Sequence, residues 1–282
     1  MSAAINIIMN KTEFPYRFFL VTFIWSWIFW IFLALASQDI IQIPSNILSK
    51  AIMPISIIGA FGPLVGAIYS IHKEKGNVIK YLRRFTDIKL GWKAYVFPIL
   101  IFGISTFIAW FFPELFGEKR LNMLLPSIWV FIPFLIIMTF FGGGQEEFGW
   151  RGYALPILEK KYGLWGANIV LGIIWGFWHL PLWFITGTNQ TYMNFGGFVL
   201  ISIGYSFIFS WIKNISGDKL FTGLYVHGIA NAIIPIFPVF SMQHNTPQPR
   251  FWIWVILTLS IGIIITIVRN KNIVKHANNK IA

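Results

Sequence analysis

The sequence contains no cysteine among its 282 residues, which excludes disulfide bonds, thiolate metal sites and a cysteine nucleophile. Charge is also scarce, since only 11 % of the residues are Asp, Glu, Lys or Arg. An ordinary soluble domain carries about 25 %. Hydrophobic residues make up 56 % of the chain. This composition excludes a soluble globular domain and predicts an all-α, polytopic membrane protein.

Apolar runs long enough to cross a bilayer recur along the whole chain. A transmembrane helix needs about 20 such residues, and this criterion predicts eight spans. Their approximate ranges are 16–36, 48–71, 94–112, 127–147, 164–185, 192–212, 220–237 and 251–268. Because no internal repeat, low-complexity tract or long linker is visible, residues 1–282 are expected to form a single transmembrane domain.

The basic residues are distributed unevenly over the segments that connect these spans. Eight spans place both termini on one side, which collects 18 of the 22 Lys and Arg residues. The other side holds Lys50, Lys119, Arg120 and Arg250. The positive-inside rule therefore predicts cytoplasmic termini in a multi-pass protein of the plasma membrane. Topology and attraction to anionic membrane lipids account for the basic charge, so no nucleic-acid partner is predicted.

Three segments allow more than one interpretation. Residues 34–37 resemble a signal-peptide cleavage site, but the apolar stretch before them exceeds the usual length of about 7–15 residues, which favours a retained helix. Residues 72–93 fit either an amphipathic helix on the membrane surface or a solvated loop. The glycines at 142–144 lack the following Gly-Lys-Ser/Thr and the preceding strand of a phosphate loop. They predict a flexible or closely packed backbone.

Ionisable residues interrupt the apolar spans of the second half, where they are costly and indicate a functional site. Each of three pairs joins such a residue to a second charged, aromatic or amide residue four positions away. This spacing places both members on one face of a helix. The pairs are Glu147 with Arg151, Trp175 with His179, and His227 with Asn231.

Two adjacent glutamates, Glu146 and Glu147, begin this group. Successive residues on a helix point about 100° apart, so both carboxylates cannot aim at one atom. A bidentate pair of Glu147 with Arg151 would leave Glu146 to face a cavity as a general base. The alternative is an ordinary ion pair that closes the cytoplasmic end of a helix. His227 is expected to bind Asn231 or Glu146, whereas a lone His179 could simply be a satisfied hydrogen-bonding residue.

The set of motifs resembles the CPBP intramembrane proteases, which include CAAX prenyl endopeptidases and the Abi and lysostaphin-resistance-like proteins. The family motifs are Glu-Glu-x-x-x-Arg, aromatic-x-x-x-His and His-x-x-x-Asn. They correspond to Glu146, Glu147 and Arg151; to Trp175 and His179, with Trp where Phe is usual; and to His227 and Asn231. The resemblance covers roughly residues 142–233, within a predicted catalytic core at 127–237. It implies an α-helical endopeptidase whose site opens toward the cytoplasm.

The resemblance also implies a mechanism. Glu146, assisted by His179, would activate a water, and His227 and Asn231 would stabilise the oxyanion. The residues expected to support them are Glu147, Arg151 and Trp175. A competing metalloendopeptidase mechanism would use Glu146, His179 and His227 as ligands of a divalent metal such as Zn²⁺. The cofactor is thus either none or such a metal.

The substrate is left open between a peptide and a lipidated peptide. The cleaved bond could lie near the C-terminus of a CAAX-type prenylated protein, in a leader peptide or in a membrane protein. Two alternatives lie outside this class: a transporter or proton-coupled carrier, and a catalytically silent immunity or scaffold protein. The sequence does not indicate the oligomeric state.

Overall fold

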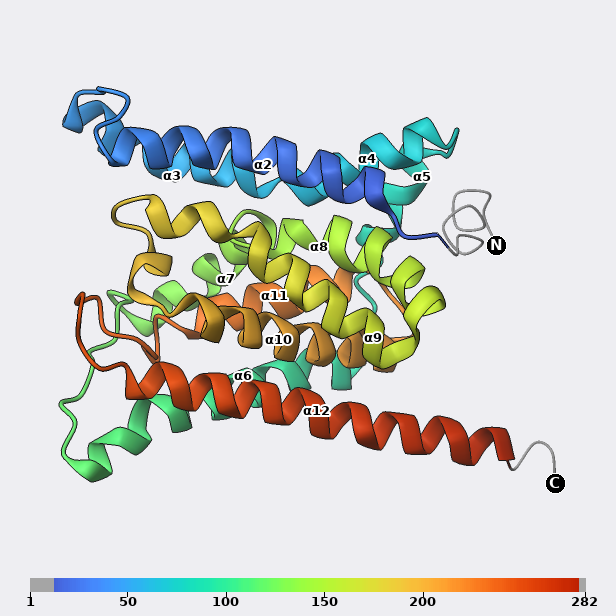
Figure 1. Ribbon diagram of the computed structural model, residues 1–282. Coiled ribbons are helices and arrows are strands. Elements are labelled where there is room, and N and C mark those ends of the chain that lie inside the picture. Colours follow the sequence, from blue (N-terminus) through green and yellow to red (C-terminus); the bar gives the residue numbers. More distant parts are fainter. Residues whose placement is uncertain (1–12, 279–282) are drawn as a thin grey trace.

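The computed structural model describes residues 13–278, which are helical with no strand among them. The helices are α2 (Tyr16–Ser37), α3 (Ser45–Ala60), α4 (Gly62–Lys73), α5 (Val78–Arg83), α6 (Trp92–Phe111), α7 (Phe131–Phe140), α8 (Glu147–Gly149), α9 (Leu155–Trp178), α10 (Phe195–Ile215), α11 (Phe221–Ile233) and α12 (Pro249–Asn278). The long helices run alongside one another in a bundle (Figure 1). The predicted all-α class is confirmed.

Six helical stretches in the described part of the chain are long and apolar enough to cross a membrane. They are Tyr16–Ser37, Ser45–Lys73, Trp92–Phe116, Ile128–Phe184, Phe195–Ile215 and Pro249–Asn270. The fourth is 57 residues long and contains two of the predicted spans, one on α7 and one on α9. The predicted span at 220–237 corresponds to α11, which has only 13 residues. All eight predicted spans thus fall on helices, and the protein is a multi-pass membrane protein.

The helices differ from the predicted ranges at a glycine and at a proline. Gly163 interrupts α9 with φ 67°, a left-handed conformation that glycine adopts without steric cost. A separate helical piece, 155–162, therefore precedes the expected span that starts at residue 164. At the other end α9 stops at Trp178, and Leu180–Phe184 forms a 3₁₀ turn, because Pro181 cannot continue an α-helix.

The helix α11 occupies the centre of the bundle, and nearly all of its residues are buried (Figure 1). The outer layer of α2, α3 and α4 is attached to the rest of the bundle through close packing and buried polar contacts. The Ser26 hydroxyl of α2 donates to the carbonyl of Gly59 at 2.7 Å and accepts the indole N–H of Trp178 at 2.8 Å. These bonds tie α2 to both α3 and α9, so α2 is an integral part of the bundle. Its retention in the mature protein stays a prediction.

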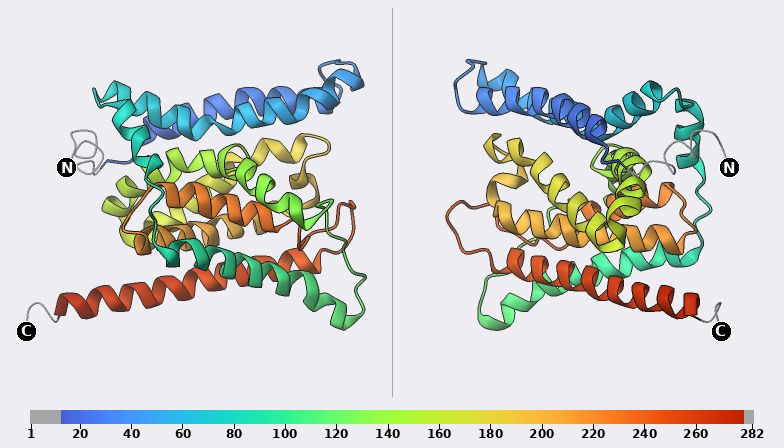
Figure 2. Two further views of the ribbon diagram at one scale, coloured as in Figure 1. Left: turned by 180° about the vertical axis from the view of Figure 1, so that it is seen from behind. Right: turned by 45° about the vertical axis from the view of Figure 1, so that its right-hand side comes forward.

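The two ends of the bundle are built from different segments. At the end we call the terminal end, α2 begins and α12 ends (Figures 1 and 2). There Lys219, before α11, donates to Asp87, before α6, at 3.1 Å. The opposite end collects the connections after α2, α6, α9 and α11. Two contacts hold them together: Gln38 donates to the Phe184 carbonyl at 3.2 Å, and the Leu124 amide donates to the Pro235 carbonyl at 2.7 Å.

The segment 72–93 contains the short helix α5 followed by a 3₁₀ turn at Arg84–Thr86. Tyr81 of α5 is buried, and its hydroxyl donates to the carbonyl of Phe148, next to Glu147. Burial raises the pKa of Tyr81, so the hydroxyl stays a proton donor. The short helix is therefore present, whereas its contact with lipid stays a prediction.

Candidate active site

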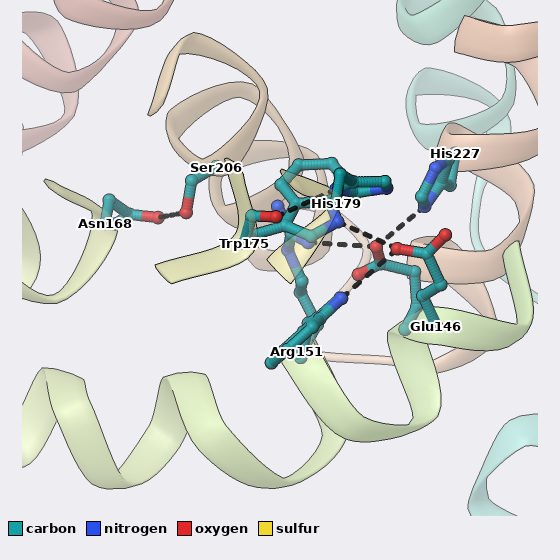
Figure 3. Close-up of polar contacts among 9 residues, drawn as sticks. Glu146, Arg151, Asn168, Trp175, His179, Ser206 and His227 are labelled. Carbon is teal, nitrogen blue, oxygen red and sulfur yellow. Dashed lines mark hydrogen bonds and ion pairs between the residues drawn. The ribbon is translucent and has the colours of Figure 1, made fainter. Parts of the chain in front are cut away.

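Glu146 follows a glycine turn that ends the helix α7 early. The helix stops at Phe140, short of the predicted boundary at residue 147, and Gly143 adopts φ 129°. The Glu146 side chain is buried, and its Oε2 accepts the indole N–H groups of Trp175 at 2.8 Å and Trp150 at 3.2 Å (Figure 3). Oε1 makes no hydrogen bond within residues 13–278 and belongs to a residue that lines a cavity. One carboxylate oxygen is thus anchored and the other is available.

Glu147 lies at the centre of a buried charge network. Its Oε1 accepts hydrogen bonds from Nη1 of Arg151 at 2.9 Å and from Nδ1 of His227 at 2.9 Å. The expectation that His227 binds Asn231 or Glu146 was wrong. This contact joins residues 80 positions apart, and only the packing of α11 against α8 brings them together.

The pair of Glu147 and Arg151 is confirmed, but it is not bidentate. Oε2 of Glu147 and both Nε and Nη2 of Arg151 have no hydrogen-bond partner among the described residues. The guanidinium instead lies 4.7 Å from the ring centroids of Trp175 and Phe209. Cation–π contacts with two rings hold the guanidinium plane. These ring contacts, and not a second hydrogen bond to Glu147, therefore orient the guanidinium.

The imidazole of His179 is fixed by its own helix. Nδ1 of His179 donates to the Trp175 carbonyl at 2.8 Å, and the ring stacks on Trp30 with a centroid distance of 6.1 Å. The side chain is buried rather than exposed to lipid. In a neutral imidazole this bond makes Nε2 an acceptor. The same reasoning applies to His227, whose Nδ1 donates to Glu147.

Asn231 lies one turn beyond His227, and its amide Nδ2 donates to the Gly142 carbonyl at 2.7 Å. A Cβ added at Gly143 would collide with Nε2 of His227 and Nδ2 of Asn231, so both side chains pack closely against this glycine. The glycine turn is therefore the floor of the site. This agrees with the predicted closely packed backbone at 142–144.

The four predicted catalytic residues line one cavity of about 470 Å³. They are Glu146, His179, His227 and Asn231. Figure 3 shows three of these side chains gathered near Trp175, with Arg151 approaching from the other side. The expected convergence is observed, whereas the role of each residue stays a prediction.

The cavity extends toward the opposite end of the bundle. Its lining includes Thr188, Asn189 and Gln190, in the connection between α9 and α10, and Phe240, after α11. The resemblance implies a site that opens to the cytoplasm, and the basic residues predict cytoplasmic termini. These two expectations cannot both hold, because α2 begins and α12 ends at the other end (Figure 1).

The sequence interpretation missed two aromatic residues of the site. Trp150 bonds to Glu146, and its position four residues after Glu146 was the available signal. Phe209 stacks on Arg151 from α10, and no sequence pattern distinguishes it from the other phenylalanines of that helix.

A metal centre on Glu146, His179 and His227 does not fit this arrangement. Within residues 13–278 no group of three or more His, Asp or Glu side chains is placed to hold a metal ion. We therefore derive no step through a metal.

Comparison with known proteins identifies relatives of this region. Residues 127–233 match the family model described as "Type II CAAX prenyl endopeptidase Rce1-like". A CAAX prenyl protease 2 of Methanococcus maripaludis is 28 % identical over 183 residues, which are 62 % of this chain and 65 % of that protein. A lysostaphin resistance protein A of Staphylococcus haemolyticus is 28 % identical over 176 residues, or 58 % of this chain and 44 % of that protein. The resemblance to the CPBP family is confirmed. The match spans less than two thirds of either relative.

The CPBP motifs thus meet in space as well as in sequence order. The first motif supplies both carboxylates, the second the indole donor and one imidazole, and the third the other imidazole and an amide. The departure from Phe to Trp at position 175 adds an N–H donor that phenylalanine lacks. The aromatic residue at this position of the second motif therefore touches Glu146 directly.

Gly143→Ala is expected to destabilise the protein and to disrupt the site. A Cβ at this position would lie 2.6 Å from Nδ2 of Asn231, and φ 129° is unfavourable for alanine. A strained backbone position costs about 1–3 kcal/mol. Thermal unfolding in detergent measures the loss. The matched control is Gly103→Ala in α6, where a Cβ meets no atom within 4 Å; equal behaviour of the two variants would contradict the assigned geometry.

Trp175→Phe should weaken the hold on Glu146 while keeping an aromatic ring. Loss of a hydrogen bond to a charged group costs about 1.5–3 kcal/mol, or roughly 10- to 100-fold in rate if the bond is made in the transition state. Trp110→Phe is the control, because its indole bonds the Leu121 carbonyl, and neither residue lines the cavity. Full activity in Trp175→Phe would show that this donor does not position the carboxylate.

Proposed function

We propose that the protein is an intramembrane endopeptidase in which Glu146 is the general base. The observation that carries this proposal is the arrangement of that carboxylate: one oxygen is anchored by two indole donors, and the other is available beside two imidazoles in a cavity. Such an anchored group needs little reorganisation when it accepts a proton.

In the proposed reaction a water lies between Oε1 of Glu146 and the carbonyl carbon of the scissile peptide bond. Glu146 takes a proton as the water oxygen attacks, and the same proton later passes to the leaving amine. Nε2 of His179, as an acceptor, would orient the water. The carbon–nitrogen bond breaks as this proton reaches the amine, and Glu146 returns to its starting state.

The oxyanion would be stabilised from the floor of the site. Asn231 uses one N–H for the Gly142 carbonyl, and its second N–H can donate to the oxyanion. His227 can donate through Nε2 only as an imidazolium, because Nδ1 already donates to Glu147. Glu147 and Arg151 thus act through His227 rather than on the substrate.

The substrate class remains a peptide bond near a CAAX-type prenylated C-terminus, in a leader peptide or in a membrane protein. Peptide termini in membranes of cells that carry the wild-type protein or Glu146→Ala provide the test. New termini that depend on Glu146 support the proposal. If no terminus is lost in the variant, the protein is not an endopeptidase under those conditions.

A non-catalytic role is the second candidate, because one relative is named a lysostaphin resistance protein. In that case Glu146→Ala would keep the cellular phenotype although the site is disrupted. The neo-terminus comparison distinguishes this role from proteolysis. Flux of a solute through proteoliposomes would instead favour a carrier.

We further propose that residues 1–282 form one transmembrane domain of the plasma membrane with a catalytic core at 127–237 and both termini in the cytoplasm. The uneven division of Lys and Arg between the two ends supports this orientation. Arg151 is buried and therefore does not contribute to the positive charge at the membrane surface. Reporter fusions at Ala282 test it.

Activity is expected to survive removal of divalent metals. The ligand geometry of Glu146, His179 and His227 gives no reason for a stoichiometric metal. Cleavage of an identified substrate, measured with and without chelator, and metal analysis of the purified protein provide the check. One tightly bound metal per chain together with loss of activity on chelation would overturn the metal-free mechanism.

A further inference from the structure

We call the part of the cavity lined by Thr188, Asn189 and Gln190 its entrance. This entrance and the basic surface lie at different ends of the molecule. Thr188, Asn189 and Gln190 line the cavity at the opposite end of the bundle, where the exposed Asn189 reaches solvent. The terminal end carries most of the Lys and Arg residues, among them those of the segment 73–93. The two sets of residues therefore face opposite sides of a membrane.

The distribution of Lys and Arg indicates which end of the bundle faces the cytoplasm. The opposite end holds Lys50, Lys119, Arg120 and Arg250. Two of these side chains already bind other groups of the protein. Arg120 is paired with Glu114 at 2.7 Å, and Arg250 donates to the carbonyls of Trp110 and Lys119. The positive-inside rule thus makes the terminal end cytoplasmic and the cavity entrance extracytoplasmic.

The charge of the cavity wall restricts the substrate further. Among the described residues that line the cavity none is Lys or Arg, and Glu146 is the only Asp or Glu. A protease that removes a C-terminal tripeptide must accommodate the terminal carboxylate, which needs a cation or several donors when desolvated. This cavity offers the terminal carboxylate no Lys or Arg, and the negative charge of Glu146 would repel it.

The cavity has one apolar and one polar flank, a combination that suits a substrate chain passing from the bilayer into water. Ile52 and Met53 of α3 and Met138 of α7 form an apolar flank, whereas Asn189 and Gln190 near the entrance are polar and uncharged. Apolar side chains accept a membrane-embedded segment, and amide side chains can bond the backbone groups of the extended chain that follows it.

We infer that the cavity receives its substrate from the extracytoplasmic side, and that this substrate is an internal, juxtamembrane peptide bond of a membrane-anchored polypeptide. This inference rests on the proposed function for the cleavage itself. The side from which the cavity is entered does not depend on it. A cytosolic CAAX C-terminus is then not a substrate.

The absence of cysteine allows a direct test of sidedness. Single-cysteine variants Asn189→Cys, at the entrance, and Lys161→Cys, exposed at the terminal end, are treated in intact cells with a membrane-impermeant maleimide. We expect labelling of Asn189→Cys in intact cells and loss of labelling for Lys161→Cys until the cells are permeabilised. The reverse pattern would overturn the inference.

The substrate class is tested separately with two readouts. Neo-termini that depend on Glu146 should map to extracytoplasmic juxtamembrane positions, and wild-type proteoliposomes should release no tripeptide from a prenylated CAAX peptide. Release of that tripeptide in a Glu146-dependent manner would refute the inference but sustain the proposed protease. Extracytoplasmic labelling of Asn189→Cys without any Glu146-dependent neo-terminus would instead refute the protease and leave the accessible side established.

Discussion

Glu146→Gln is expected to lower the cleavage rate by about 10²- to 10⁴-fold, the range that general-base catalysis contributes. The amide oxygen of glutamine can still accept the indole N–H groups of Trp150 and Trp175, so the fold and the site geometry should persist. Only the ability to take a proton from water is lost. Initial rates with an identified substrate in proteoliposomes measure the effect.

The control for this substitution is Glu118→Gln. Glu118 is half exposed and lies 4.0 Å from Arg250, in the connection after α6. This variant should cleave at the wild-type rate. A Glu146→Gln protein that folds normally and cleaves as fast as the control would remove Glu146 from the mechanism.

Arg151→Ala is expected to destabilise the protein by about 3–5 kcal/mol, the cost of leaving one partner of a buried ion pair alone. Glu147 is fully buried, and after the substitution only His227 would remain as its partner. Thermal unfolding in detergent provides the measurement. Arg120→Ala, which breaks an exposed pair with Glu114, should change the unfolding temperature little.

A double variant tests whether charge or packing is responsible. Replacement of both partners, Glu147→Gln with Arg151→Met, removes the uncompensated charge and should recover a large part of the lost stability. Activity should not return, because His227 would lose the carboxylate to which its Nδ1 donates and which holds its ring in place. Equal stability of Arg151→Ala and the double variant would contradict this account.

Arg151→Lys separates the ion pair from the ring contacts. A lysine could replace the single bond to Glu147, but not the planar stack between Trp175 and Phe209. We expect this variant to be more stable than Arg151→Ala and still to lose activity, since misplacement by about 1 Å can cost about 100-fold in rate. Wild-type activity would show that the rings do not orient the guanidinium.

The amino-acid sequence by itself determined the helical membrane class and the residues that meet at the site. Composition excludes a soluble domain, and the spacing of four in Glu147 and Arg151 reports a contact within one helical turn. Contacts within one helical turn can be predicted from the sequence because the geometry of an α-helix is the same in any protein. The same reasoning would also have found Trp150 next to Glu146.

Contacts between helices were decided only by the tertiary structure. His227 binds Glu147 rather than Asn231. Arg151 contacts the ring of Phe209 instead of forming the expected second hydrogen bond to Glu147. These outcomes depend on how each helix is rotated and on which neighbour it packs against, and the pattern within one helix does not encode either. The direction of the cavity has the same origin, because it is set by the breaks at Gly143 and Pro181 and by the loops gathered at one end of the bundle.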